Sequence, residues 1–132
     1  MGHPLRYVIQ RHEREPDPHF DIMLERGDAL KTFSSPELPR SGPPIEVHAL
    51  PDHRLDYLEY EGEISGGRGS CSIRDRGTYL VSIWGDDRIV VHLEGGILRG
   101  TISLDRIDGE RWGLCFEDSA IPGLPAGGGS EA

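Results

Sequence analysis

Two histidines and an aspartate near the N-terminus have side chains and a spacing that could bind a metal ion. His19 and Asp21 stand two residues apart in the segment HFDIMLE (19–25), where apolar and polar residues alternate. Because alternate residues of a strand point to the same side, the two side chains share a face. His12 precedes them across a loop with two prolines, so a hairpin would bring it close to His19.

Two imidazoles and one carboxylate leave coordination positions open, as catalytic metal sites do. Manganese suits such a ligand set, and zinc is the alternative. The same spacing also occurs on solvated strand faces that bind nothing, so the pattern alone leaves both interpretations open.

Short apolar alternations separated by Gly, Pro and Asp indicate the elements that position these residues, and they predict an all-β protein. We expect about eight antiparallel strands, with short helical turns, closed into a small barrel that removes exposed edges. Asp75-Arg76-Gly77 should interrupt one run, with Gly77 as a turn or bulge and Asp75 beside Arg76 as a candidate pair. The expected strands are Leu5–Gln10, Phe20–Glu25, Ala29–Phe33, Ile45–Leu50, Ser70–Arg74, Thr78–Trp84, Arg88–Glu94, Ile97–Arg106 and Arg111–Phe116.

Length and composition predict one domain, residues 1–120, followed by a disordered Gly/Pro-rich tail, 121–132. The formal charge of -9 argues against broad, non-specific nucleic-acid binding but leaves a local basic site open. Cys71 and Cys115 form no Cys-x-x-Cys motif and are expected to be reduced core thiols. With no signal peptide or membrane span in the sequence, we expect a cytoplasmic protein.

A second group of residues, DHRLDY (52–57) followed by YEG (60–62), extends the pattern. Together with QRH…HFDIMLE (10–25), RDRGTY (74–79) and LRGTISLDRI (98–107), it resembles the 3′-phosphoesterase domain of bacterial DNA ligase D. The resemblance covers roughly residues 6–117, with the motifs in the same order and at nearly the same spacings.

The resemblance implies a manganese-dependent enzyme whose site lies inside a β-barrel and which removes a 3′-ribonucleoside or 3′-phosphate from nucleic-acid ends. It implies metal ligands at His12, His19 and Asp21, and we expect these three side chains to converge on the ion at the mouth of the closed sheet. It also implies catalytic roles for His53, as a donor to a phosphate oxygen, and for Tyr57.

Gln10 matches the family's glutamine and is expected to contact substrate. The chain departs from the family pattern at the residues that bind phosphate. Met23, Glu37 and the region of Pro44 and Ile45 align with family basic positions, and none of them is basic. The first motif gap is also one residue longer than usual. Candidate substitute cations are Arg11, Arg54 and Arg40, with Arg11 and Arg54 as the expected substrate contacts.

Two functional hypotheses follow. The first is a metal-dependent phosphoesterase that acts on the 3′ ends of DNA or RNA–DNA primer strands, with a repair ligase or polymerase acting in trans. The second is a non-catalytic β-barrel that binds metal or phosphate and docks on repair proteins, which the missing basic residues and the acidic charge favour. The segment Ser65–Ser70 (SGGRGS) could cradle a phosphate, but it lacks the lysine and helix of a Walker loop and is expected to be a flexible turn.

Overall fold

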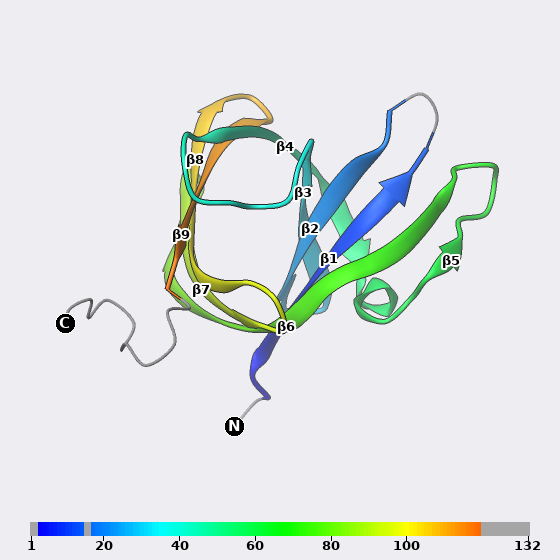
Figure 1. Ribbon diagram of the computed structural model, residues 1–132, viewed down its shortest axis with the longest axis horizontal. Helices are drawn as coiled ribbons and strands as arrows, with labels where there is room; N and C mark the ends of the chain where they lie inside the picture. The colour runs from blue at the N-terminus through cyan, green and yellow to red at the C-terminus, as the bar shows by residue number, and fades with distance from the viewer. Residues whose placement is uncertain (1–2, 15–16, 120–132) are drawn as a thin grey trace.

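The computed structural model describes residues 3–14 and 17–119, which form one antiparallel sheet that curls and closes on itself (Figure 1). The only helical element in these ranges is a short 3₁₀ turn, η1, at Leu55–Leu58, and none there could span a membrane. The strands are β1 Leu5–Glu13, β2 His19–Arg26, β3 Ala29–Ser35, β4 Ile45–Arg54, β5 Gly62–Glu63, β6 Ser70–Trp84, β7 Arg88–Gly95, β8 Arg99–Asp108 and β9 Arg111–Asp118.

Strand pairing confirms the expected closed barrel. Neighbours follow the order β1-β2-β3-β4-β9-β8-β7-β6, and β1 pairs with β6 to close the ring of eight. The short strand β5 adds to the outer part of β6 and, with η1, lies beside the barrel (Figure 1). The predicted tail, 121–132, lies outside the described residues.

β6 is one continuous strand, where two strands separated at residues 75–77 were predicted. Its first part pairs with β1 and its second part with β7, so one strand serves both halves of the barrel. Gly77 was predicted as a turn or bulge, but it lies inside this strand in regular register with Tyr7 and Gly95. A Cβ on Gly77 would lie 2.2 Å from the Glu94 carbonyl oxygen, so glycine is needed for the close approach of β6 and β7.

The sequence suggested that Asp75 pairs with Arg76, but the structure gives Asp75 other partners. Its buried carboxylate accepts a 2.7 Å hydrogen bond from the Tyr7 hydroxyl and bonds from the backbone N–H groups of Ile97 and Leu98. Burial is the main reason why the pKa of Tyr7 is raised, and the bond to Asp75 adds to it. Asp75 therefore fastens the β7–β8 turn to the barrel wall.

Two apolar clusters lie on opposite faces of β1 and β2. The large cluster fills the barrel and includes Ile9, Phe20 and Ile22. The small cluster consists of Val8, Met23, Leu30 and Leu58, on the outer face and beneath η1. Alternation along β2 therefore directs even-numbered residues inward and odd-numbered residues, Asp21 and Met23 among them, outward.

The cysteines have different surroundings. Cys71 is buried on β6, as predicted, but Cys115 is exposed on β9, and both thiols are free. Cys115 alternates with Leu114 and Phe116, whose side chains fill the barrel, so it must face outward.

Candidate metal centre

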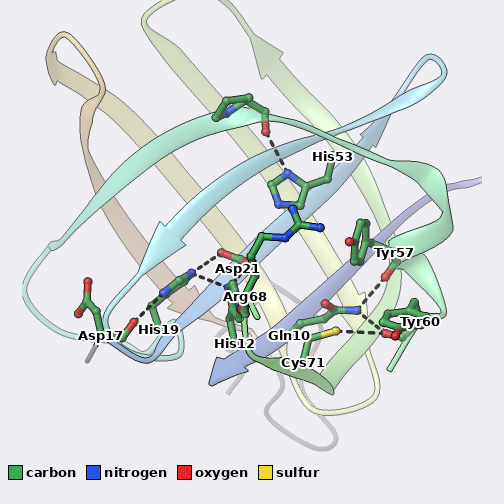
Figure 2. A network of polar contacts seen from close by, with 11 residues as sticks. Gln10, His12, Asp17, His19, Asp21, His53, Tyr57, Tyr60, Arg68 and Cys71 are labelled. Carbon is green, nitrogen blue, oxygen red and sulfur yellow. Dashed lines mark hydrogen bonds and ion pairs between the residues drawn. The ribbon is translucent and has the colours of Figure 1, made fainter. Parts of the chain in front are cut away.

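The β1–β2 hairpin brings the predicted metal ligands together. His12 lies opposite His19, and Gln10 lies opposite Asp21, in the antiparallel register. Nδ1 of His12 is 3.2 Å from Nε2 of His19, which is 3.1 Å from Oδ1 of Asp21 (Figure 2). One ligand atom from each of the three residues lies within 4.8 Å of the others. This spacing is compatible with a common ion after small side-chain movements.

The outer nitrogen of each imidazole is held by a backbone carbonyl. Nε2 of His12 lies 2.8 Å from the Arg68 carbonyl oxygen, and Nδ1 of His19 lies 3.1 Å from that of Asp17. Because a carbonyl oxygen can only accept, these outer nitrogens carry the protons and donate. In the neutral rings the inner nitrogens then present lone pairs to each other and to Asp21. Metal-binding histidines are commonly oriented in this way.

Asp21 leaves an uncompensated oxygen in this cluster. Its Oδ1 is buried, and no hydrogen bond of good geometry reaches it from the described residues, although Nε2 of His19 approaches within ion-pair distance. The interaction with Asp21 raises the pKa of His19, and burial opposes that rise. Two inward lone pairs beside a buried carboxylate form a site that a cation would complete, so the residues present fit a divalent metal.

The cluster lies on the outer face of the barrel wall, near the ends of β1 and β2, and not inside the barrel as the resemblance implied. Alternation decides this, because Phe20 and Ile22 occupy the interior and Asp21 must point the other way. The side chains border a cavity of about 390 Å³, to which η1 contributes Tyr57 and the β5–β6 loop contributes Ile64 and Arg68. Its lining residues are Gln10, His12, Arg14, Asp17, His19, Asp21, Ser34, Leu50, His53, Tyr57, Ile64, Arg68 and Cys71.

His53 and Tyr57 line the same cavity from the end of β4 and from η1. Nδ1 of His53 lies 3.0 Å from the Pro51 carbonyl oxygen and donates to it, which leaves Nε2 as the ring nitrogen available to a ligand. The His53 and Tyr57 rings meet edge to face with centroids 5.7 Å apart. The second histidine motif is therefore brought to the first, as the resemblance implied.

Gln10 borders the cavity, but its amide nitrogen is already engaged. This side chain is 2 % exposed and donates to the carbonyl oxygens of Tyr57 and Tyr60, both at 2.8 Å (Figure 2). It thereby ties η1 to β1 and fixes the backbone that carries Tyr57. The geometry thus gives Gln10 a positioning role, where substrate contact was expected.

Neither of the two expected arginine contacts lines the cavity. Arg11 alternates with Gln10 and His12, so its guanidinium lies on the opposite face of β1, over the Phe20 ring and 2.8 Å from a Glu13 carboxylate oxygen. Arg54 follows His53 on β4 and is exposed to solvent. Both arginines were predicted as contacts because each is adjacent in sequence to a site residue. Adjacent residues of a strand point to opposite sides, so neither arginine faces the cavity.

The positions that align with the family's phosphate-binding basic residues, and the candidate substitute Arg40, supply no cation to the cavity either. Met23 is fully buried in the small apolar cluster, and Ile45 is buried in the barrel. Glu37 is paired at 2.9 Å with Arg40, which does not line the cavity. The missing basic residues are therefore not compensated at these places.

Two basic residues at the cavity, Arg14 and Arg68, were not predicted from the sequence. Arg68 is the only charged residue of the segment SGGRGS, which we expected to be a plain turn. A single arginine among glycines was the available signal. Arg68 reaches the cavity because the β5–β6 loop folds over the His12 end of β1.

Fold and site together define a class: a small antiparallel β-barrel with an outward-facing His-His-Asp cluster, opposed by a third histidine across a solvent-accessible cavity. The family model for the DNA ligase D 3′-phosphoesterase domain matches residues 10–106. The chain belongs to this family.

Similar proteins include the multifunctional non-homologous end joining DNA repair protein LigD of Mycobacterium tuberculosis and the LigD of Mycobacterium bovis. Each is 36% identical over 116 residues, which cover 80% of this chain and 15% of the relative. The LigD of Pseudomonas aeruginosa is 35% identical over 80 residues, covering 57% of this chain and 9% of that protein. The chain thus spans about 15% of the length of the first two relatives.

Proposed function

We propose that this protein is a metal-dependent phosphoesterase that removes a 3′-phosphate or a 3′-ribonucleotide from nucleic-acid ends during DNA repair. Membership of the 3′-phosphoesterase family supports the reaction class. The observation that carries the metal dependence is the convergence of three ligand atoms within 4.8 Å, with one buried carboxylate oxygen left without a hydrogen bond. DNA ends and RNA–DNA primer strands are the proposed substrates, with a repair ligase or polymerase in trans as partner.

His12, His19 and Asp21 would hold the divalent ion, with Mn²⁺ favoured and Zn²⁺ as the alternative. When bound, the ion supplies positive charge beside the phosphoryl oxygens, which stabilises the charge that develops there. The carbonyls of Arg68 and Asp17 keep both imidazoles in the tautomer that this task requires.

His53 would act on the opposite side of the phosphate. Removal of a 3′-phosphate breaks the bond between phosphorus and the 3′ oxygen, water supplies the new oxygen on phosphorus, and the 3′ oxygen leaves as a hydroxyl. With Nδ1 donating to Pro51, Nε2 of His53 is the candidate donor of a proton or hydrogen bond in that step when the imidazole carries both protons. Packing against the Tyr57 ring and the bond to Pro51 hold the imidazole in place.

The test is release of phosphate from a primer with a 3′-phosphate, and of the terminal nucleoside from a primer ending in one ribonucleotide, in Mn²⁺, Zn²⁺ or EDTA. We expect wild type to be active only when Mn²⁺ or Zn²⁺ is present, and His19→Ala to be inactive. For His53→Ala we expect the rate to fall about a hundredfold. His48→Ala is the matched control, because His48 is exposed on β4 and does not line the cavity. Equal release by wild type and His19→Ala, in every metal and on both primers, would refute the proposal.

The second candidate function is a non-catalytic module that binds metal or phosphate and docks on repair proteins. Burial of Met23 in an apolar cluster and pairing of Glu37 with Arg40 favour it, because neither position supplies a cation to a phosphoryl group. It predicts metal binding without turnover, and capture of partners that survives His53→Ala.

A further inference from the structure

The guanidinium of Arg68 is a cationic group at the cavity that the proposed mechanism leaves unused. Arg68 lies in the loop before β6 and lines the cavity together with the His-His-Asp cluster and His53. Figure 2 shows its side chain projecting over the cavity from the side of the cluster. The residue is exposed, so a ligand entering from solvent would meet it.

The charge of Arg68 is not neutralised by a neighbouring acid. Its Nε donates to the Ser65 carbonyl oxygen at 2.7 Å and Nη2 to the Ser65 hydroxyl at 3.3 Å. No carboxylate of the described residues forms an ion pair with it, whereas Arg88 and Arg111 each have an acidic partner. A guanidinium has five N–H donors, so about three remain for a ligand, in the fork that suits phosphate oxygens.

The loop also holds Arg68 beside the metal cluster. The backbone carbonyl of Arg68 accepts the 2.8 Å bond from His12. The next residue, Gly69, has a φ of +92°, and a Cβ there would lie 2.0 Å from the Glu13 carbonyl oxygen. Only glycine allows the loop to approach β1 so closely. The position of Arg68 relative to the His12 ring is therefore built into the backbone.

We propose that Arg68 binds the terminal phosphate of the substrate, in place of cations at positions 23, 37 and 44–45. The identity of the ligand as a nucleic-acid 3′ end rests on the proposed function. The Arg68 side chain supplies the charge that Met23 and Ile45 cannot supply from their apolar surroundings. Because this cation comes from a loop and the metal ligands come from a hairpin, phosphate binding and metal binding are separable by mutation.

The experiment measures binding of a fluorescein-labelled oligonucleotide with a 3′-phosphate, against the same oligonucleotide with a 3′-hydroxyl, by fluorescence anisotropy. Titrations are run in EDTA and in CaCl₂, and a gel checks that the phosphate is intact. We expect wild type to prefer the 3′-phosphate, Arg68→Ala to lose about tenfold of that preference, and Arg68→Lys to lie between them.

Arg74→Ala is the matched control. Arg74 is exposed on β6, carries the same charge, bonds to Ser72 and does not line the cavity, so its removal should leave the preference unchanged. An unchanged preference in Arg68→Ala, or no preference in wild type under either condition, would overturn the proposal. A preference that depends on Arg68, in a protein that releases no phosphate, would instead reject the phosphoesterase function and uphold the binding role.

Discussion

Glu25 gives the sharpest prediction about stability, because it is a buried carboxylate with several donors around it. It lies on the same face of β2 as Asp21, and its side chain is 3% exposed. The Arg6 side chain donates to it through Nε at 3.1 Å and Nη2 at 3.0 Å, the Arg6 backbone N–H donates at 2.9 Å, and His3 lies at 2.9 Å. The hydrogen bonds from Arg6 are the main reason why the pKa of Glu25 falls from 4.5 to about 2.

This shift has a definite sign and size. The unfolded chain binds a proton at Glu25 near pH 4.5 and the folded protein only near pH 2, so the stabilisation is complete above pH 4.5 and is lost as the pH falls toward 2. The full interval corresponds to roughly 3 kcal/mol. The Arg6 and His3 side chains are 43% and 60% exposed, so solvent screens them. About 2 kcal/mol is the value we expect.

Urea unfolding of wild type and Glu25→Gln at a series of pH values measures this contribution. We expect Glu25→Gln to be about 2 kcal/mol less stable at pH 7, and the difference to fall to less than half by pH 3. Glu117→Gln, at an exposed glutamate of β9, is the control for loss of one negative charge. If the free energies of unfolding of wild type and Glu25→Gln decline in parallel between pH 6 and pH 3, the assigned role of Glu25 is wrong.

Three further predictions concern the site. We expect Mn²⁺ or Zn²⁺ to raise the melting temperature of wild type, and Asp21→Asn to abolish that rise yet leave the metal-free protein at least as stable, because it removes a charge with an unsatisfied oxygen. Met23→Arg should lower the free energy of unfolding by about 3 kcal/mol or more, measured in urea, because it buries a guanidinium in an apolar cluster. Gln10→Ala should speed hydrogen exchange in η1 and cost about 1–3 kcal/mol, because the Tyr57 and Tyr60 carbonyls lose their donor; unchanged exchange would contradict this.

The sequence predicted most of the strands and the His-His-Asp cluster because both depend on local rules, whereas closure of the barrel needs the distant pairings of β1 with β6 and of β4 with β9. Strand alternation puts His19 and Asp21 on one face, and a hairpin register puts His12 opposite His19. The two prolines of the connection identified that hairpin. These relations involve residues close in the chain, where pattern and geometry are tightly linked.

The face of the barrel on which the cluster lies could not be predicted in this way. A polar strand face can point toward solvent, into a barrel lumen or beneath another segment. The choice depends on η1, whose Leu58 covers Val8 and Met23 from far along the chain. The same non-local packing makes Gln10 a structural donor to η1.

The placement of cations shows the same division between local and non-local control. The register of one hairpin brings the three ligand residues together, so their positions in the fold do not require basic residues at positions 23, 37 and 45. Met23 can then be apolar and serve the packing of η1, because the β1–β2 register places Asp21 opposite Gln10 without an arginine at position 23. A cation is still needed wherever a phosphate is to bind, and the β5–β6 loop supplies Arg68 through a carbonyl contact to His12. A site assembled from a rigid hairpin and a separate loop can therefore lose one set of cations and regain charge elsewhere without disturbing its metal ligands.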